Sequence, residues 1–407
     1  SRPPVPPGMA SPPPPVPPPS PPSPVSPPVE HLTFLQGDEV DYLARWETLI
    51  ADSYSALATA PALRSECAGH GVAIDGTPAD LPTQVLTGEV GAAQAQAACG
   101  GGTVCVVDAG ATLRMDGSLN VAALVVRGAL QWDDATQAAD EQWLCAGYVV
   151  AEAGGVFNLT VHAKRAWLFI KDNAAAHGSL GPRAFGGVLG TVELSGRPLR
   201  RTWSLLATPV AAGEESISLL HDPVEMGWRV GDRIMVAPTK RASAGDAEAF
   251  TIAGFDAGNA VRLSGATAQA FAAEMRTAGA EGGVALLSAE VIHLSRSVVL
   301  TGDDFSHVPC AGVSGGTTCT MGLQSVMIGH GGVIRVQHAR VEKCGQRGVR
   351  GKYCLHMHQM GECADCLFRG NAVEFGHQRG LVVHGTHRAT VSENVLTDVR
   401  GAGIYIE

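Results

Sequence analysis

The 407-residue chain has few charged and few aromatic residues: Asp, Glu, Lys and Arg together make up 17% of it, and Phe, Trp and Tyr 5%. No apolar run approaches the roughly 18 residues that a membrane-spanning helix needs, so no span is predicted. The chain has no Lys- or Arg-rich run and a formal net charge of −10, which argues against a nucleic-acid partner. What it has instead is glycine, with 50 residues. That profile favours many short strands and tight turns over helical bundles.

Residues 1–30 hold 16 of the 25 prolines. Because proline fixes φ and lacks an N–H, such a run takes the extended polyproline II conformation. At about 3.1 Å per residue, the segment would form a rod of roughly 90 Å. We interpret it as a linker or stalk, or as an element for self-assembly.

Residues 31–83 form a helical linker region in our interpretation. Apolar residues recur there at steps of three and four, from Val40 to Leu57, and Asp38 and Glu39 stand at the start. This pattern predicts an amphipathic helix that ends before Pro61.

From about residue 84 the chain consists of short apolar runs separated by glycine, such as "AALVVRGAL". Such runs are too short for helices and apolar on both faces, as buried strands are. A parallel solenoid accounts for them, because each coil stacks on the next and buries a continuous interior.

The last part of the chain contains a visible repeat with a shift of 23 residues, about one coil of a parallel β-helix. The matched pairs are Asn371 and Asn394, Val373 and Leu396, Gly380 and Gly403, Leu381 and Ile404, and Val383 and Ile406. Asparagines at matched turns can form a stacked ladder of side chains. The chain stops at Glu407 directly after "GIYI" without a polar capping coil, so we expect the β-helix to continue beyond it.

The stretch "LHMH" at 355–358 places two histidines on one face of a strand, since residues two apart point the same way. Aligning it with "LVVH" at 381–384 and "MIGH" at 327–330 puts four residues at one position in successive coils. They are His330, His358, His384 and Glu407. Coils stack about 4.8 Å apart, so the alignment predicts a ladder of these side chains.

Three interpretations of this ladder stay open. It can be structural, with imidazoles bonded to each other and to the backbone. It can hold a divalent metal, because neutral histidine with a carboxylate suits zinc or another transition metal; no ligand set is assigned. It can also belong to a glycan-binding face that includes His356, His377 and His387.

If the glycan-binding face is also an active site, it needs catalytic acids or bases. Hydrolysis of a sugar usually uses two carboxylates about 5–10 Å apart, and elimination needs a base beside the sugar acid. The catalytic candidates are His358, His384, Glu374, Asp398 and Glu407. Spacing singles out none of them. Asp232, beside a turn glycine, is explained by turn chemistry, with cation or glycan contact as the alternative.

The chain has an even number of cysteines, which we expect to form disulfides in an oxidising compartment. They are Cys67, Cys99, Cys105, Cys145, Cys310, Cys319, Cys344, Cys354, Cys363 and Cys366. Cys310 with Cys319 and Cys344 with Cys354 would each close a loop. The alternative for "CADC" at 363–366 is a zinc site shared with Cys354 and His356. Asn158 begins an N-glycosylation sequon.

Several segments resemble one family. "VVDAGATLRMDGSLNVAALVVRGALQWDD", "GTVELSGRPLRRTWSLL" and "GWRVGDRIMVAPT" are similar to a G8 domain, a β-rich module named for its eight glycines. "GVRGKYCLHMHQMG" and "GLVVHGTHRATVSENVLTDVRGAGIYIE" resemble the parallel β-helix that follows it, in fibrocystin-like proteins and hyaluronan-depolymerising proteins. The resemblance covers about residues 84–407. It implies a G8-like β-domain at 84–262, a right-handed parallel β-helix at 263–407, and an extracellular location.

The "PPSPPSP" units resemble hydroxyproline-rich glycoproteins of algal and plant cell walls. That resemblance implies hydroxylated, glycosylated prolines, among them Pro13, Pro14, Pro18, Pro21 and Pro22.

We therefore expect an all-β extracellular glycoprotein with one helix before its β-domains. Its expected role is structural or glycan-binding at the cell surface or wall, with polysaccharides or wall glycoproteins as partners. The alternatives are a polysaccharide hydrolase or lyase and a mechanical component of an extracellular fibre.

Overall fold

The computed structural model describes residue 67 and residues 80–171, 173–239, 247–278, 283–302, 322–346 and 349–407. The proline-rich segment, the helix expected at 38–57, Cys310 and Cys319 lie outside the described residues. Within them the regular secondary structure is almost entirely β-strand, arranged mainly as parallel sheets. The expected all-β fold with a parallel β-helix is confirmed.

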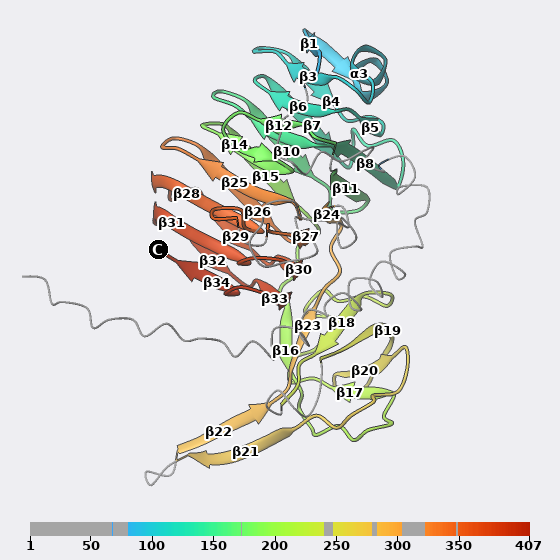
Figure 1. Cartoon of the computed structure of the whole chain (residues 1–407). Coiled ribbons are helices and arrows are strands. Elements are labelled where there is room, and N and C mark those ends of the chain that lie inside the picture. Colours follow the sequence, from blue (N-terminus) through green and yellow to red (C-terminus); the bar gives the residue numbers. More distant parts are fainter. Residues whose placement is uncertain are drawn as a thin grey trace, which may run out of the picture. The chain divides into compact units, whose positions relative to one another are not determined.

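Three parallel sheets form the walls of the β-helix, and successive coils stack from β1 to β34 (Figure 1). The nine-stranded sheet contains β1 (Thr83–Leu86), β3 (Val104–Val107), β6 (Ala123–Val126), β9 (Tyr148–Ala151), β14 (Ala184–Val188), β25 (Gln324–Ile328), β28 (Leu355–Glu362), β31 (Leu381–His387) and β34 (Ile404–Ile406). The eight-stranded sheet contains β2 (Glu89–Gly91), β4 (Thr112–Arg114), β7 (Ala129–Asp133), β10 (Val156–Thr160), β15 (Thr191–Ser195), β26 (Val333–Gln337), β29 (Leu367–Arg369) and β32 (Thr390–Ser392). The seven-stranded sheet contains β5 (Leu119–Asn120), β8 (Glu141–Ala146), β11 (Arg165–Ile170), β24 (Val298–Gly302), β27 (Ala339–Cys344), β30 (Ala372–Gly376) and β33 (Val395–Val399).

The core lies between these walls, where each strand turns alternate side chains inward. Trp132, Phe157, Phe185 and Phe368 are completely buried in it, as members of one continuous hydrophobic cluster. A solenoid needs such continuity, because a single coil cannot bury its apolar face alone.

The repeat found in the sequence is confirmed residue by residue. Val373 pairs with Leu396 and Val383 pairs with Ile406 in neighbouring parallel strands. The expected asparagine ladder is also present: the side-chain nitrogen of Asn371 donates to the side-chain oxygen of Asn394 at 3.0 Å. The 23-residue shift is therefore one full coil.

An antiparallel module, residues 199–294, is inserted between β15 and β24. Its six-stranded sheet contains β16 (Trp203–Leu205), β17 (Ser216–Ser218), β18 (Arg233–Val236), β19 (Glu248–Asp256), β20 (Ala260–Leu263) and β23 (Glu290–His293). It has a hydrophobic core of its own, which includes Leu206, Trp228, Ile234 and Phe271. Two hairpins complete the fold, namely β12 (Ala176–His177) with β13 (Gly181–Pro182) and, within the module, β21 (Ala273–Ala278) with β22 (Gly283–Ser288). Parallel coils thus occur in both predicted domains, the G8-like domain at 84–262 and the β-helix at 263–407.

One helix in the described residues, α3 (Ala92–Cys99), lies in the stretch that we expected to be wholly strands. Its sequence "AAQAQAAC" is rich in alanine, the best helix former. The carboxylate of Asp116 accepts a hydrogen bond from the Ala92 N–H at 2.8 Å, which satisfies one donor at the helix start. Gln96 exchanges two hydrogen bonds with the Asn120 backbone, so α3 is fixed against the first coils.

The described cysteines form four disulfides, and none of them is free. The pairs are Cys67 with Cys145, Cys99 with Cys105, Cys344 with Cys354, and Cys363 with Cys366. The expected loop closure by Cys344 and Cys354 is confirmed. Since every one of these thiols is paired, the alternative zinc site that would use "CADC" and Cys354 is wrong.

Candidate functional site

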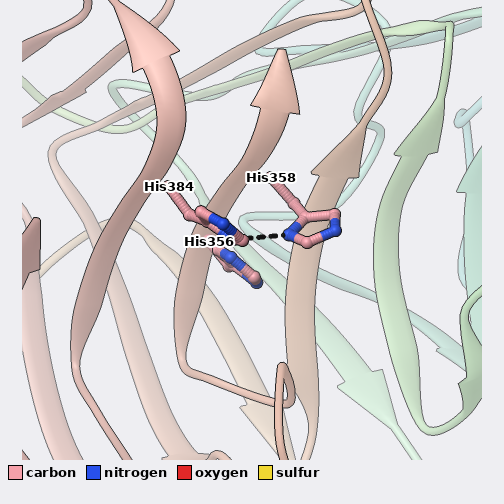
Figure 2. Close-up of side chains that lie close together, drawn as sticks. All are labelled: His356, His358 and His384. Carbon is pink, nitrogen blue, oxygen red and sulfur yellow. Dashed lines mark hydrogen bonds between the residues drawn. The ribbon is translucent and has the colours of Figure 1, made fainter. Parts of the chain in front are cut away.

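Three histidines meet on the outer face of the nine-stranded sheet (Figure 2). On β28, Leu355 and Met357 point into the core and are completely buried, so His356 and His358 point the other way. His358 pairs with His384 on β31. Glu407 continues the same row, because its N–H donates to the Val383 carbonyl at 3.0 Å.

His330, the fourth expected member of this row, is not part of it. Ile328 is the residue opposite His358, a shift of 30 residues, whereas His330 would require 28. His330 lies in the exposed turn after β25. The alignment of "MIGH" with "LHMH" assumed a coil of 28 residues, whereas this coil has 30.

The histidines line a pocket of about 410 Å³. Its wall consists of Gln324, Val326, Ile328, Arg350, Gly351, Lys352, Tyr353, His356, His358, His384 and Glu407. The loop before β28 covers part of it and leaves His356 only 2% exposed. The disulfide between Cys344 and Cys354 closes this loop onto the sheet.

The protonation of His356 is fixed by its surroundings. Its Nδ1–H donates to the Gly351 carbonyl at 3.1 Å, so the lone pair is on Nε2. Nε2 is buried and has no hydrogen-bond partner among the described groups. Burial, with a smaller contribution from His358, lowers the pKa of His356 to about 3. The imidazole is therefore neutral at physiological pH.

His358 and His384 contact each other edge to face, and their Nδ1 atoms are 3.0 Å apart. Burial and the neighbouring His384 lower the pKa of His358, although Glu407 acts in the opposite direction. The His384 and His356 rings are nearly parallel, with centroids 6.1 Å apart. The surroundings of His356 and His358 thus disfavour positive charge on these two imidazoles.

Cationic and aromatic groups surround the imidazoles. Lys352 donates from Nζ to the Leu180 carbonyl, and burial lowers its pKa to about 8. The Arg379 guanidinium lies 3.5 Å above the Tyr405 ring and 3.6 Å from the Glu407 carboxylate. These groups were not singled out from the sequence. For Lys352, the signal that could have found it is "GVRGKY", a basic loop between two cysteines expected to pair; no such signal marks Arg379.

The structure brings only some of the predicted catalytic residues together. His358, His384 and Glu407 share the pocket. Glu374 lies on β30 of the seven-stranded sheet, completely buried between Arg233 and Arg340. Asp398 lies on β33 of that same sheet. Among the described lining residues, Glu407 is the single carboxylate of the pocket.

The expected glycan-binding trio is not assembled either. His356 is in the pocket, whereas His377 is buried directly after β30. His387 is exposed at the end of β31. Asn158 is exposed on β10, where its side-chain oxygen accepts a hydrogen bond from Thr160 at 3.0 Å. Its glycosylation stays a prediction.

Asp232 belongs to a buried polar cluster in the inserted module. His293 donates from Nε2 to its carboxylate at 2.8 Å, and Arg197 contacts the same oxygen at 3.0 Å. Burial raises the pKa of Asp232, but the His293 hydrogen bond, the charge of Arg197 and the hydrogen bond from the Arg229 backbone outweigh this and lower the pKa overall. These contacts give Asp232 a structural role. Turn chemistry alone does not account for them, and they do not indicate a contact with glycan.

The fold and the pocket define a class: a parallel β-helix with an inserted antiparallel module and a histidine cluster on its longest sheet. The family model described as CEMIP β-helix matches residues 320–407, which include all three histidines. Human Fibrocystin-L is 29% identical over 248 residues, which cover 54% of this chain and 6% of that protein. A G8 domain-containing protein of Dictyostelium discoideum is 25% identical over 220 residues, 54% of this chain and 17% of that protein. The chain is thus similar to G8-domain proteins and, over its last part, to the CEMIP β-helix family.

Among solved structures, a tailspike of the Acinetobacter baumannii bacteriophage AP22, in complex with capsular saccharide, is 10% identical, with a TM-score of 0.20. That match covers 72% of this chain and 41% of the tailspike. The chain spans only a small part of the curated relatives. The described residues contain no helix long and apolar enough to cross a membrane, and the disulfides indicate an oxidising compartment.

Proposed function

We propose that this protein acts at the cell surface or wall and binds an acidic polysaccharide at the histidine pocket. The observation that carries the proposal is the composition of the pocket wall. In a chain of net charge −10, Arg350 and Lys352 bring two basic groups to a cavity with one carboxylate. A local excess of positive charge in an acidic protein favours an anionic ligand.

The other lining groups suit a sugar. Neutral imidazoles can both donate and accept hydrogen bonds with hydroxyl groups, and the Tyr353 ring offers an apolar face beside them, 4.9 Å from the His356 ring. A volume of about 410 Å³ falls in the usual range of small-ligand sites. The pocket lies on a sheet of nine stacked strands, and such long rigid walls suit extended polymers.

A depolymerising activity is the second candidate, and the pocket restricts its type. Hydrolysis by the usual two-carboxylate route needs a second carboxylate near Glu407, and the described lining residues supply none. Elimination needs a base beside the sugar acid. His384, whose Nδ1 is 3.7 Å from the Glu407 carboxylate, is the candidate for that base. If the protein is an enzyme, we therefore expect a lyase.

The test is a binding and chain-length assay with matched acidic and neutral polysaccharides. We expect the acidic polymers to bind, with an affinity that falls as salt rises. Arg350→Ala combined with Lys352→Ala should weaken binding about tenfold or more, equivalent to about 1.4 kcal/mol. Arg229→Ala, which removes an exposed arginine from the inserted module, is the matched control and should change nothing.

Equal binding of neutral and acidic polymers, or equal loss in the control variant, would contradict the proposal. Shortening of the polymer with formation of an unsaturated end would establish the lyase, provided that His384→Ala abolishes it. The roles expected for residues 1–30, glycosylation and self-assembly, stay predictions.

A further inference from the structure

We propose that His356, His358 and His384 form a binding site for one divalent transition-metal ion, with Glu407 as the fourth ligand. Each histidine offers one ring nitrogen, and these nitrogens all lie within 4.8 Å of one another. Three histidines and one carboxylate form a donor set that suits zinc. The histidines lie on the adjacent strands β28 and β31, and the carboxylate directly follows β34.

The orphaned nitrogen of His356 distinguishes this proposal from a purely structural ladder. In a ladder, the 3.0 Å contact between His358 and His384 would satisfy one nitrogen of each ring. Nε2 of His356 would still be buried with no described partner. Leaving a buried polar atom unpaired is unfavourable. An ion coordinated by Nε2 removes that deficit.

The hydrogen bond on the far side of the His356 ring supports the same conclusion. Metal-binding histidines usually donate their other N–H to a carbonyl or carboxylate, which fixes the tautomer and the ring orientation. The Nδ1–H bond to the Gly351 carbonyl is such a contact, at 3.1 Å. Gly351 is in the loop that the disulfide from Cys344 to Cys354 holds in place. His356 is thus oriented before any ligand arrives.

The spacing of the ligand atoms fits a small ion after a modest adjustment. Two nitrogens bound to one tetrahedral zinc at about 2.0 Å are about 3.3 Å apart. The Nδ1 atoms of His358 and His384 are already 3.0 Å apart. Both side chains are only half-buried, so small rotations can close the remaining distances.

The pocket as a whole is basic, but one carboxylate lies directly beside the histidines and offsets part of the charge of a cation. Glu407 lies 3.7 Å from Nδ1 of His384 and supplies a negative charge. Arg379 contacts that carboxylate at 3.6 Å, and Lys352 donates to the Leu180 carbonyl.

The experiment uses the full 407-residue chain, without a tag, stripped with a chelator. Cobalt(II) is titrated in while its visible absorption is followed, and zinc is titrated by calorimetry against a competing chelator. We expect one ion per chain and a tetrahedral cobalt spectrum. His358→Ala and His384→Ala should each lower the affinity by at least about 100-fold, beyond the roughly 10–100-fold typical of losing a second-shell partner.

Two further variants sharpen the result. Glu407→Gln should lower the affinity and alter the cobalt spectrum, since a neutral amide is a weaker ligand than a carboxylate. His387 lies on β31 like His384, but it is exposed and outside the pocket. The His387→Ala variant should therefore bind metal like the wild type. Circular dichroism of each variant checks folding. A His356→Ala variant removes a buried side chain and can fail to fold, so the variants of the half-buried His358 and His384 are the decisive ones.

Absence of stoichiometric cobalt and zinc binding in the wild type would overturn the proposal. Equal loss in His387→Ala would overturn the assignment of the ligands. No polysaccharide is present in these titrations, so their outcome is independent of whether the pocket binds a glycan.

Discussion

Arg233 and Glu374 form a two-pronged ion pair, in which one arginine nitrogen lies 2.9 and 3.0 Å from the two carboxylate oxygens. Arg233 belongs to the inserted module and Glu374 to the seven-stranded sheet of the β-helix. Glu374 is completely buried and also contacts Arg340 at 2.9 Å. This carboxylate therefore joins the module to the β-helix and has a structural role.

Glu374→Ala should destabilise the protein by about 3–5 kcal/mol, because it leaves the Arg233 and buried Arg340 charges with one partner fewer. Urea unfolding followed by tryptophan fluorescence measures the effect. Asp256→Ala is the control: it removes an exposed pair with Arg262, whose loss should cost about 1 kcal/mol or less. Equal midpoints for the two variants would refute the structural role of Glu374.

Asn371→Ala should destabilise the β-helix by about 2–4 kcal/mol, at about 1–3 kcal/mol for each buried group left unpaired. The Asn371 side chain accepts from the Ala339 N–H at 3.0 Å and donates to the Val336 carbonyl at 2.8 Å. Asn394→Ala removes the next side chain of the asparagine ladder. The double variant then measures the coupling free energy between Asn371 and Asn394. Strictly additive effects would mean that the two asparagines do not act as a ladder.

Gly186→Ala should prevent stable stacking of β14 on β25. The Gly186 φ is +147°, and an added Cβ would lie 1.8 Å from the Val326 carbonyl oxygen of the neighbouring strand. We expect a loss of at least about 3 kcal/mol, or no folded protein. Gly101→Ala, where nothing lies within 4 Å of the added atom, should be close to neutral. Thermal unfolding of both variants checks this, and a wild-type midpoint for Gly186→Ala would contradict it.

Acid should destabilise the inserted module through His293. Burial lowers its pKa to about 4, although the Asp232 hydrogen bond opposes the shift. Arg296 donates to Nδ1 at 2.9 Å, which keeps the proton on Nε2. The unfolded chain takes up a proton near pH 6.5, whereas the folded chain does so near pH 4. The folding free energy contributed by neutral His293 is therefore complete above pH 6.5 and decreases by about 3 kcal/mol as the pH falls to 4.

Urea midpoints at pH 7 and pH 4.5 measure this effect, with Trp228, 5.1 Å from the His293 ring, as a fluorescent reporter. His293→Gln should flatten the decrease without abolishing it. His338, whose pKa burial also lowers to about 4, titrates in the same direction and remains in the variant. An identical pH dependence in wild type and variant would show that His293 does not contribute.

Zinc should stabilise the folded chain if the three-histidine site exists. An ion that binds only the folded state stabilises it by about 2.7 kcal/mol at a free concentration 100 times its dissociation constant. Thermal unfolding with and without zinc measures the shift, and His384→Ala should remove most of it. His387→Ala should retain the shift, and a shift that persists in both variants would place the ion elsewhere.

The register of the last coils follows from the sequence because apolar periodicity and matched asparagines are local signals. Val373 over Leu396 and the shared outward direction of His356 and His358 could both be predicted in this way. The pairing of Cys344 with Cys354 was expected from the short loop between them. His330 was misplaced because the length of a turn between coils is not encoded in the strand pattern.

A parallel β-helix with His356 and His358 on one face of a strand could be predicted from the amino-acid sequence, because alternation and a one-coil repeat depend only on neighbouring strands. Tertiary structure decided what those residues do. It buried Glu374 between arginines from separate segments and left Nε2 of His356 without a described partner beneath a loop. Burial and partners depend on contacts between residues far apart in the chain, and no local pattern specifies these contacts.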